Sequence, residues 1–166
     1  MGIALLVSRD DIVKFTAVNG NTDTDKFIQW VKVAQDTHIQ GYLGTRLFER
    51  INNGIVNNNL PTAYRTLLNT YIKPMVIHWS MVEYLPFAAY TIGNKGVYKH
   101  GSENSENVAK DDIDFLVEKQ RSIAEHYTRR FVDYMSFKQH LFPEYNLNSN
   151  GDMFPNSSAD FGGWYI

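Results

Sequence analysis

The chain has 166 residues, no cysteine and a formal net charge of −2, from 16 basic and 18 acidic side chains. This length fits one domain, and the lack of cysteine excludes disulfides, thiolate metal sites and cysteine nucleophiles. Lysine and arginine are scattered singly apart from Arg129 and Arg130, which disfavours the basic face of a DNA-reading protein. No stretch approaches the ~20 apolar residues of a membrane span, so we expect a soluble, non-secreted protein without a membrane partner.

Apolar residues recur at helical spacing through most of the chain and predict an all-α body. Ser8 is expected to cap a short helix that ends at the Asn19-Gly20-Asn21 turn. A longer helix is expected to begin at Asp23 or Thr24 and to run through Tyr42, with one apolar face.

Two features are expected between this helix and the next. Leu47, Phe48 and Ile51 continue the apolar stripe in a short second helical piece, after glycines interrupt the first. Residues 52–59 contain five asparagines and one glycine, which predicts a loop.

The second half of the chain predicts two long helices around a hairpin. A helical period covers 61–89, and Pro74 inside it removes a backbone hydrogen bond, so we expect a kink or a break into two helices. Pro86 should end or bend the second part. Residues 90–99 predict a small inserted β-hairpin around a Gly-Asn-Lys-Gly turn, and 111–135 predict the last helix.

The apolar positions of the last helix predict one buried stripe. We expect the alanine substitutions of Leu116 on this stripe and of Trp79 on the preceding helix to leave cavities and to cost about 2 to 5 kcal/mol each. The stripe consists of Ile113, Leu116, Gln120, Ile123, Tyr127, Phe131 and Tyr134.

Residues 141–166 carry six aromatic side chains without a helical or strand period, and three acids without a lysine or arginine. The pattern indicates an extended arm that lies along another surface, so we divide the chain into a helical domain over 1–140, with the hairpin near 90–99, and an arm over 141–166. The alternative is a terminal segment that folds back on its own domain. If the arm binds elsewhere, truncation after Lys138 leaves the stability of the monomer nearly unchanged. The predicted interface residues are Phe142, Tyr145, Phe154, Phe161, Trp164 and Tyr165 in the arm, and Asn94, Lys95 and Tyr98 in the hairpin.

Residues that carry enzyme chemistry form no recognisable constellation. The five histidines do not cluster in the sequence, and His38 and His78 lie on apolar stripes, where a hydrogen-bonded core histidine is the favoured interpretation. No phosphate loop, nucleophile elbow or zinc-protease motif occurs. We therefore expect no enzyme activity, no cofactor and no metal.

Several stretches, in their order along the chain, resemble a known family. They are Ala34 to Asp36, Tyr42 to Phe48, Leu60-Pro61, Tyr71 to Pro74 and Phe142 to Tyr145. Together they resemble the head-to-tail connector (adaptor) ring proteins of tailed bacteriophages, particularly the ring proteins below the portal in crAss-like phages. The resemblance covers nearly the whole chain.

This resemblance implies a helical bundle with an inserted hairpin, assembled as a homo-oligomeric, dodecameric ring. The ring would dock on the portal protein, join it to the tail or to further adaptor proteins, and let DNA pass nearby without sequence-specific binding. The protein would then be a structural component of the virion, assembled in the host cytoplasm. The family has no catalytic residues to carry over.

Two other functions stay open at this point. One is a small helical-bundle enzyme or ligand binder, with His38, His78 and Glu83 as its plausible polar residues. The other is a monomeric module whose arm binds a partner.

Overall fold

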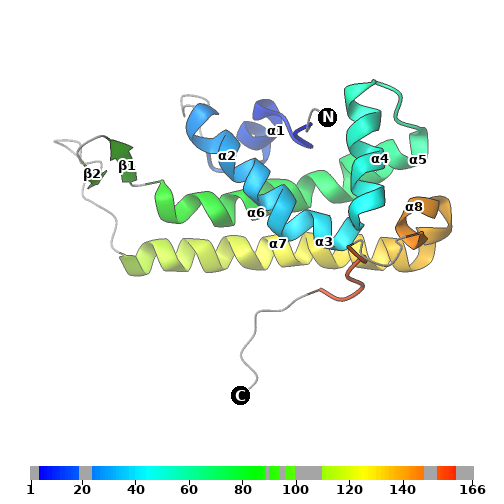
Figure 1. The fold of residues 1–166 in the computed structure, drawn as a ribbon. Helices are drawn as coiled ribbons and strands as arrows, with labels where there is room; N and C mark the ends of the chain where they lie inside the picture. The colour runs from blue at the N-terminus through cyan, green and yellow to red at the C-terminus, as the bar shows by residue number, and fades with distance from the viewer. Residues whose placement is uncertain are drawn as a thin grey trace, which may run out of the picture.

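The computed structural model describes residues 4–18, 24–88, 90–93, 96–99, 110–147 and 153–159, and its fold is all-α, as the helical periodicity predicted (Figure 1). Short 3-10 or π turns (η) join several of the helices. The elements are α1 (Arg9–Phe15), α2 (Thr24–Ala34), η1 (Gln35–Ile39), α3 (Gln40–Leu43), α4 (Thr45–Val56), α5 (Thr62–Leu67), η2 (Leu68–Ile72), α6 (Lys73–Tyr84), η3 (Leu85–Phe87), β1 (Tyr90–Gly93), β2 (Gly96–Lys99), α7 (Lys110–Lys138), η4 (Gln139–Leu141) and α8 (Pro143–Asn146).

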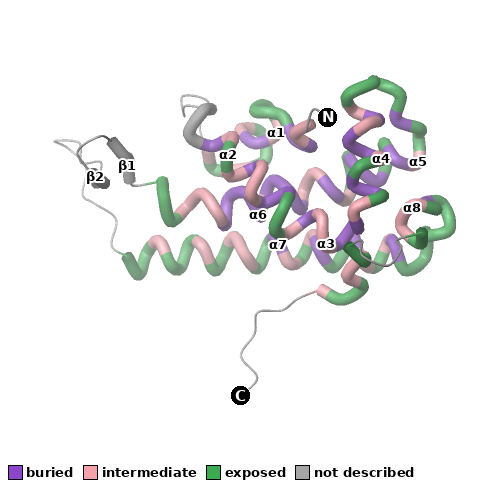
Figure 2. The backbone as a smooth tube through the Cα atoms, in the orientation of Figure 1, coloured by how far each residue is buried: buried purple, intermediate pink, exposed green. Residues whose placement is uncertain are grey.

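Helix α6 is the centre of the body. It packs against α7 on one side and against α2 on another, and α1 also contacts it (Figure 1). A helix covered on several sides has to be apolar nearly all round. Accordingly, Met75, Val76 and Ile77 occupy three successive positions of α6 and are all buried, and the purple part of the tube in Figure 2 runs through this helix.

The helix is irregular at both of the prolines where the sequence predicted a kink or an end. The irregularity predicted at Pro74 is present as the π turn Leu68–Ile72, which joins α5 directly to α6 without a loop. A π turn re-pairs the carbonyls of the preceding turn, which the missing N–H of proline leaves without their usual donor. Pro86 lies in the 3-10 turn Leu85–Phe87 that ends α6, as predicted. Gly44, at φ 73°, separates α3 from α4 in the left-handed region that favours glycine.

The loop predicted over 52–59 is wrong in its first half, because α4 continues to Val56. Tertiary contacts outweigh the low helix propensity of asparagine and glycine here. Asn52 is buried, and its Oδ1 accepts a hydrogen bond from the Ala4 N–H at 2.6 Å. Gly54 packs so closely on the following loop that a Cβ there would lie 2.3 Å from Leu60 Cδ1.

The stripe predicted on the last helix is buried only in its second half. Phe131 is fully buried, whereas Leu116 is 48% exposed and Ile123 is 37% exposed. The expected cavity at Leu116 is therefore wrong, because a half-exposed side chain leaves no enclosed volume when it is shortened. The elements that cover the second half of α7 do not extend over these positions of its first half.

The first residues after the predicted boundary at residue 140 pack on the helical body. Phe142 is fully buried in the core, with its ring edge-on to Tyr64 at 5.1 Å between centroids, and Tyr145 is half-buried against the same core. Glu144 of α8 accepts a hydrogen bond from the Tyr64 hydroxyl at 2.5 Å. Phe142 and Tyr145 thus belong to the domain itself, and truncation after Lys138 is expected to remove core.

Most of the other predicted interface residues, in the hairpin and in the arm, lie outside the described part of the chain. β1 and β2 pair antiparallel with Tyr98 opposite Thr91, whereas Asn94 and Lys95 lie outside the described residues. The arm predictions Phe161, Trp164 and Tyr165 also lie outside them.

Part of the C-terminal segment crosses the body. The Asn156 N–H donates to the Gly41 carbonyl at 2.7 Å, which fixes 153–159 beside α3, and Phe154 in this stretch is 61% exposed. Within the described ranges, no helix is both long and apolar enough to cross a bilayer.

Candidate functional site

A cleft of about 480 Å³ lies between α1, the η2–α6 helix and α7. Its lining combines three cations with flat rings, and it is the candidate site. The residues that give it this character are Lys14 and Phe15 from α1, Lys73 and His78 from α6, and Tyr127 and Arg130 from α7.

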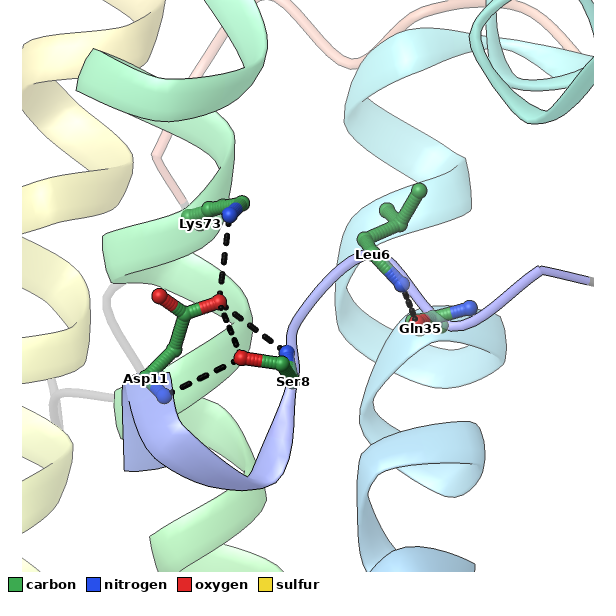
Figure 3. A network of polar contacts seen from close by, with 5 residues as sticks. All are labelled: Leu6, Ser8, Asp11, Gln35 and Lys73. Carbon is green, nitrogen blue, oxygen red and sulfur yellow. Dashed lines mark hydrogen bonds and ion pairs between the residues drawn. The ribbon is translucent and has the colours of Figure 1, made fainter. Parts of the chain in front are cut away.

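Helix α1 is fixed at one wall of this cleft by a capping network (Figure 3). Ser8 caps α1 as predicted, because its Oγ accepts from the Asp11 N–H at 3.2 Å while Asp11 Oδ2 accepts from the Ser8 N–H at 3.0 Å. The same carboxylate oxygen pairs with Lys73 Nζ at 3.1 Å. Burial alone would favour the protonated acid, but the hydrogen bonds from Ser8 and Lys73 outweigh it and lower the pKa of Asp11.

The segment before α1 is held by two buried amides. Gln35 is fully buried, and its Oε1 accepts from the Leu6 N–H at 2.7 Å (Figure 3). Its Nε2 donates to the Ala4 carbonyl at 3.3 Å. Since Asn52 also accepts from Ala4, residues 4–8 are tied to α4 and η1, and this connection positions α1 over α6.

His78 lines the cleft as a neutral donor. Burial lowers its pKa, so the imidazole is neutral near pH 7. Gln120 Nε2 donates to its Nδ1 at 2.8 Å, which leaves the single ring proton on Nε2. The ring stacks parallel to Tyr127, with 5.1 Å between centroids.

Arg130 is held between two tyrosine rings. Its guanidinium carbon lies 5.8 Å from the ring centre of Tyr71 and 5.7 Å from that of Tyr127. Lys14 Nζ lies 5.3 Å from the ring centre of Phe15. Across the part of the chain that the structure describes, no carboxylate pairs with Lys14 or Arg130. The cleft therefore contains two cations that no carboxylate of the described ranges neutralises.

A second polar group lies on another side of α6. His38 Nε2 is 2.7 Å from Glu83 Oε1, and the His38 ring stacks on Trp79 with 4.0 Å between centroids. Trp79 Nε1 in turn donates to Thr128 Oγ1 at 3.0 Å. These contacts join η1, α6 and α7, so they agree with the interpretation of His38 as a hydrogen-bonded histidine of the core.

The candidate residues for an enzyme come together only in part. His38 and Glu83 are in contact, but His78 makes its contacts with Gln120 and Tyr127. Among the described residues, no three histidine or acidic side chains are arranged to hold a metal ion.

The sequence analysis missed the cationic cleft. Lys14, Lys73 and Arg130 are separated by more than fifty residues each, and no local spacing connects them. Of the residues singled out in the sequence, His78 and Arg130 line the cleft.

Residues 39–155 of the chain match the family described as a family of unknown function, DUF6712. The match runs from η1 to the segment beside α3 and includes Lys73, His78 and Arg130 but not α1. No curated protein and no solved structure is significantly similar to the chain.

Proposed function

Because the chain belongs to DUF6712, a family of unknown function, its role must be argued from its own residues, and we propose that it is a structural subunit of a phage head-to-tail connector ring. In this role it is a virion protein that docks on the portal and joins it to the tail or to a further adaptor around the DNA channel. The observation that carries the proposal is the presence of exposed apolar side chains at both ends of α7.

The first of these surfaces, the entry patch, lies on the first half of α7. It consists of Phe115, Leu116 and Ile123, which are 65%, 48% and 37% exposed. Leu116 and Ile123 are seven residues apart and so lie on one side of the helix. Large apolar groups gathered on a surface are typical of contacts with another chain.

The second surface, the exit patch, lies around the other end of α7. Its four side chains come from α7, the turn that follows it, the end of α8 and the segment beside α3. Figure 1 places α8 at the opposite end of α7 from the strands β1 and β2. The residues are Phe137, Leu141, Leu147 and Phe154, and all of them are exposed.

Two different apolar surfaces at opposite ends of one helix suit a ring. A head-to-tail contact joins unlike surfaces of neighbouring subunits, and it closes into a ring when the rotation between subunits allows it. A twofold dimer with antiparallel α7 helices would also pair the two patches, so the size of the assembly distinguishes a ring from a dimer. In the proposed ring the entry patch of one subunit packs on the exit patch of the next, and the number of twelve subunits is taken from the sequence resemblance alone.

In this proposal the hairpin and the C-terminal arm make further contacts with neighbouring subunits or with the portal. The body is a helical bundle with a proline-broken long helix, an inserted hairpin and an extended arm. Asn94, Lys95 and Tyr98 of the hairpin contact a neighbour or line the channel. Phe161, Trp164 and Tyr165 of the arm bind an adjacent subunit or a partner on the portal side.

The test is assembly of the full-length protein with the portal protein of the same virus, observed by negative-stain electron microscopy and by mass photometry. The double change Leu116→Ser and Ile123→Ser is expected to abolish rings while the thermal unfolding midpoint stays within a few degrees. Val56→Ser is the matched control, since Val56 is 58% exposed on α4, outside both patches. Rings that form equally well with the double variant, or an isolated chain that never joins a portal-bound assembly, would refute the proposal.

A further inference from the structure

We infer that the cleft between α1, α6 and α7 binds a phosphate ester, with the phosphate on Lys14, Arg130 and His78 and a planar group against Phe15. This inference is independent of the ring, because neither the entry patch nor the exit patch contributes to the cleft.

The cleft is rich in hydrogen-bond donors, three of which carry or share a positive charge or an N–H that no described carboxylate engages. Lys14 and Arg130 carry charges that no carboxylate of the described residues neutralises, and His78 adds an N–H on Nε2. Thr70 and Asn69, which each carry a side-chain donor, also line the space. A cleft rich in donors selects an oxyanion, and a phosphate offers three acceptor oxygens where a carboxylate offers two.

The single acid of the cleft does not oppose such a ligand. Asp11 is committed to the Ser8 N–H and Oγ and to Lys73 Nζ, at 3.0, 3.0 and 3.1 Å. The Asp11–Lys73 pair is neutral as a unit, so the net charge that a ligand meets is that of Lys14 and Arg130.

Arg130 is prepared for a bidentate contact. The rings of Tyr71 and Tyr127 hold the guanidinium over their faces at 5.8 and 5.7 Å. A cation–π contact leaves the guanidinium N–H groups available for hydrogen bonds, and a guanidinium held in place loses less side-chain entropy when it binds a phosphate.

The remaining walls favour a ligand with a flat ring. Phe15 is 55% exposed although it lines the cleft, and Ile77 and Pro74 supply further apolar surface. The volume of about 480 Å³ lies in the range of small-molecule sites. A nucleotide combines a phosphate with a planar base, and it has two sources, a free nucleotide or a unit of a nucleic-acid strand.

The experiment is a titration of the full-length, isotopically labelled protein, followed by two-dimensional amide NMR at about 0.15 M salt, where distant charges are screened. The probes are inorganic phosphate, AMP, adenosine and a short single-stranded thymidine oligonucleotide. We expect AMP to bind with a Kd below about 1 mM, to shift amide signals near Lys14, Thr70 and Arg130, and to bind more tightly than inorganic phosphate, with no binding of adenosine. A free nucleotide is the source if AMP binds and the oligonucleotide does not, and a strand is the source if the oligonucleotide binds more tightly than AMP.

Two variants with a matched control locate the site. Arg130→Gln and Lys14→Gln are each expected to weaken binding about tenfold, as the loss of one charge-assisted contact predicts. Lys119→Gln removes the same charge from the exposed side of α7 and should leave the Kd unchanged. Equal affinities for all three variants, shifts that map elsewhere, or no binding of any phosphate-bearing probe would overturn the inference.

Discussion

The two halves of α7 share an apolar helical spacing but differ in what covers them. The second half buries Ala124, Phe131 and Met135 under α6 and its neighbours, whereas the first half leaves Phe115 and Leu116 exposed. A periodic apolar pattern predicts that a helix forms and that one of its sides is apolar. The pattern does not determine whether the surface that covers this side belongs to the same chain, and four predictions test the difference.

The largest effect is expected in the buried half of α7. Phe131→Ala should lower the free energy of unfolding by about 3 to 5 kcal/mol, since a fully buried ring leaves a cavity. Trp79→Ala, whose side chain packs across from this half and donates to Thr128, should fall in the same range. Leu116→Ala should cost less than about 1 kcal/mol. Denaturant unfolding of the three variants is the measurement, and a Leu116 cost as large as that of Phe131 would show that the first half is covered within the monomer.

A similar effect is expected where the chain leaves α7. Phe142→Ala should cost about 3 to 5 kcal/mol, whereas Phe154→Ala, at a 61% exposed position, should change stability by less than about 0.5 kcal/mol. Truncation after Lys138 should likewise lower the thermal unfolding midpoint of the monomer, because it removes Phe142 and the contact of Glu144 with Tyr64. Circular dichroism melting is the measurement, and an unchanged midpoint for the truncated chain would support the predicted boundary at residue 140.

A smaller effect is expected at the amides that hold the N-terminal segment. Gln35→Ala should cost about 1 to 3 kcal/mol, because it leaves the buried Leu6 N–H and the Ala4 carbonyl without their partner. Gln29→Ala, on the exposed side of α2, is the matched control and should stay within about 0.5 kcal/mol. Equal costs for the two changes in chemical denaturation would mean that the hydrogen bonds of Gln35 to residues 4–6 contribute nothing to stability.

The smallest effect is a pH dependence at the contact between α6 and α7. Burial holds the pKa of His78 below 6.5 in the folded protein, so the unfolded chain binds the proton first as the pH falls. Stability from this group is therefore complete above pH 6.5 and declines below it, down to the folded pKa. The loss from Asp11, whose pKa is lowered from 3.8, begins only near that value. His78→Gln should flatten the decline in urea unfolding between neutral and mildly acidic pH, and an unchanged slope would assign the decline to another group.

Local chemistry predicted many of the helix ends. Ser8 can cap α1 because its hydroxyl reaches the N–H groups of the first turn, and Pro86 ends α6 because it has no N–H to donate. The π turn before Pro74 was predictable as an irregularity, but the sequence did not specify its form. The serine cap and the prolines each act within four or five residues. The helix ends that they set can therefore be predicted without knowledge of the rest of the fold.

The errors concern how the helices and loops pack on one another rather than local helix chemistry. Residues 52–56 are helical because Asn52 bonds Ala4 and Gly54 packs on Leu60, and neither contact is visible in local propensity. Phe142 is buried because Tyr64 lies beside it.

The sequence by itself determined the all-α class, the order of the helices and the lack of a local catalytic motif, because helix period, caps and motifs are short-range properties. Only the tertiary structure decided which apolar side chains are covered, where the body ends, and that Lys14, Lys73 and Arg130 meet in one cleft. Burial and the clustering of charges depend on which surfaces pack together. Short-range sequence patterns do not show which residues about sixty positions apart become neighbours.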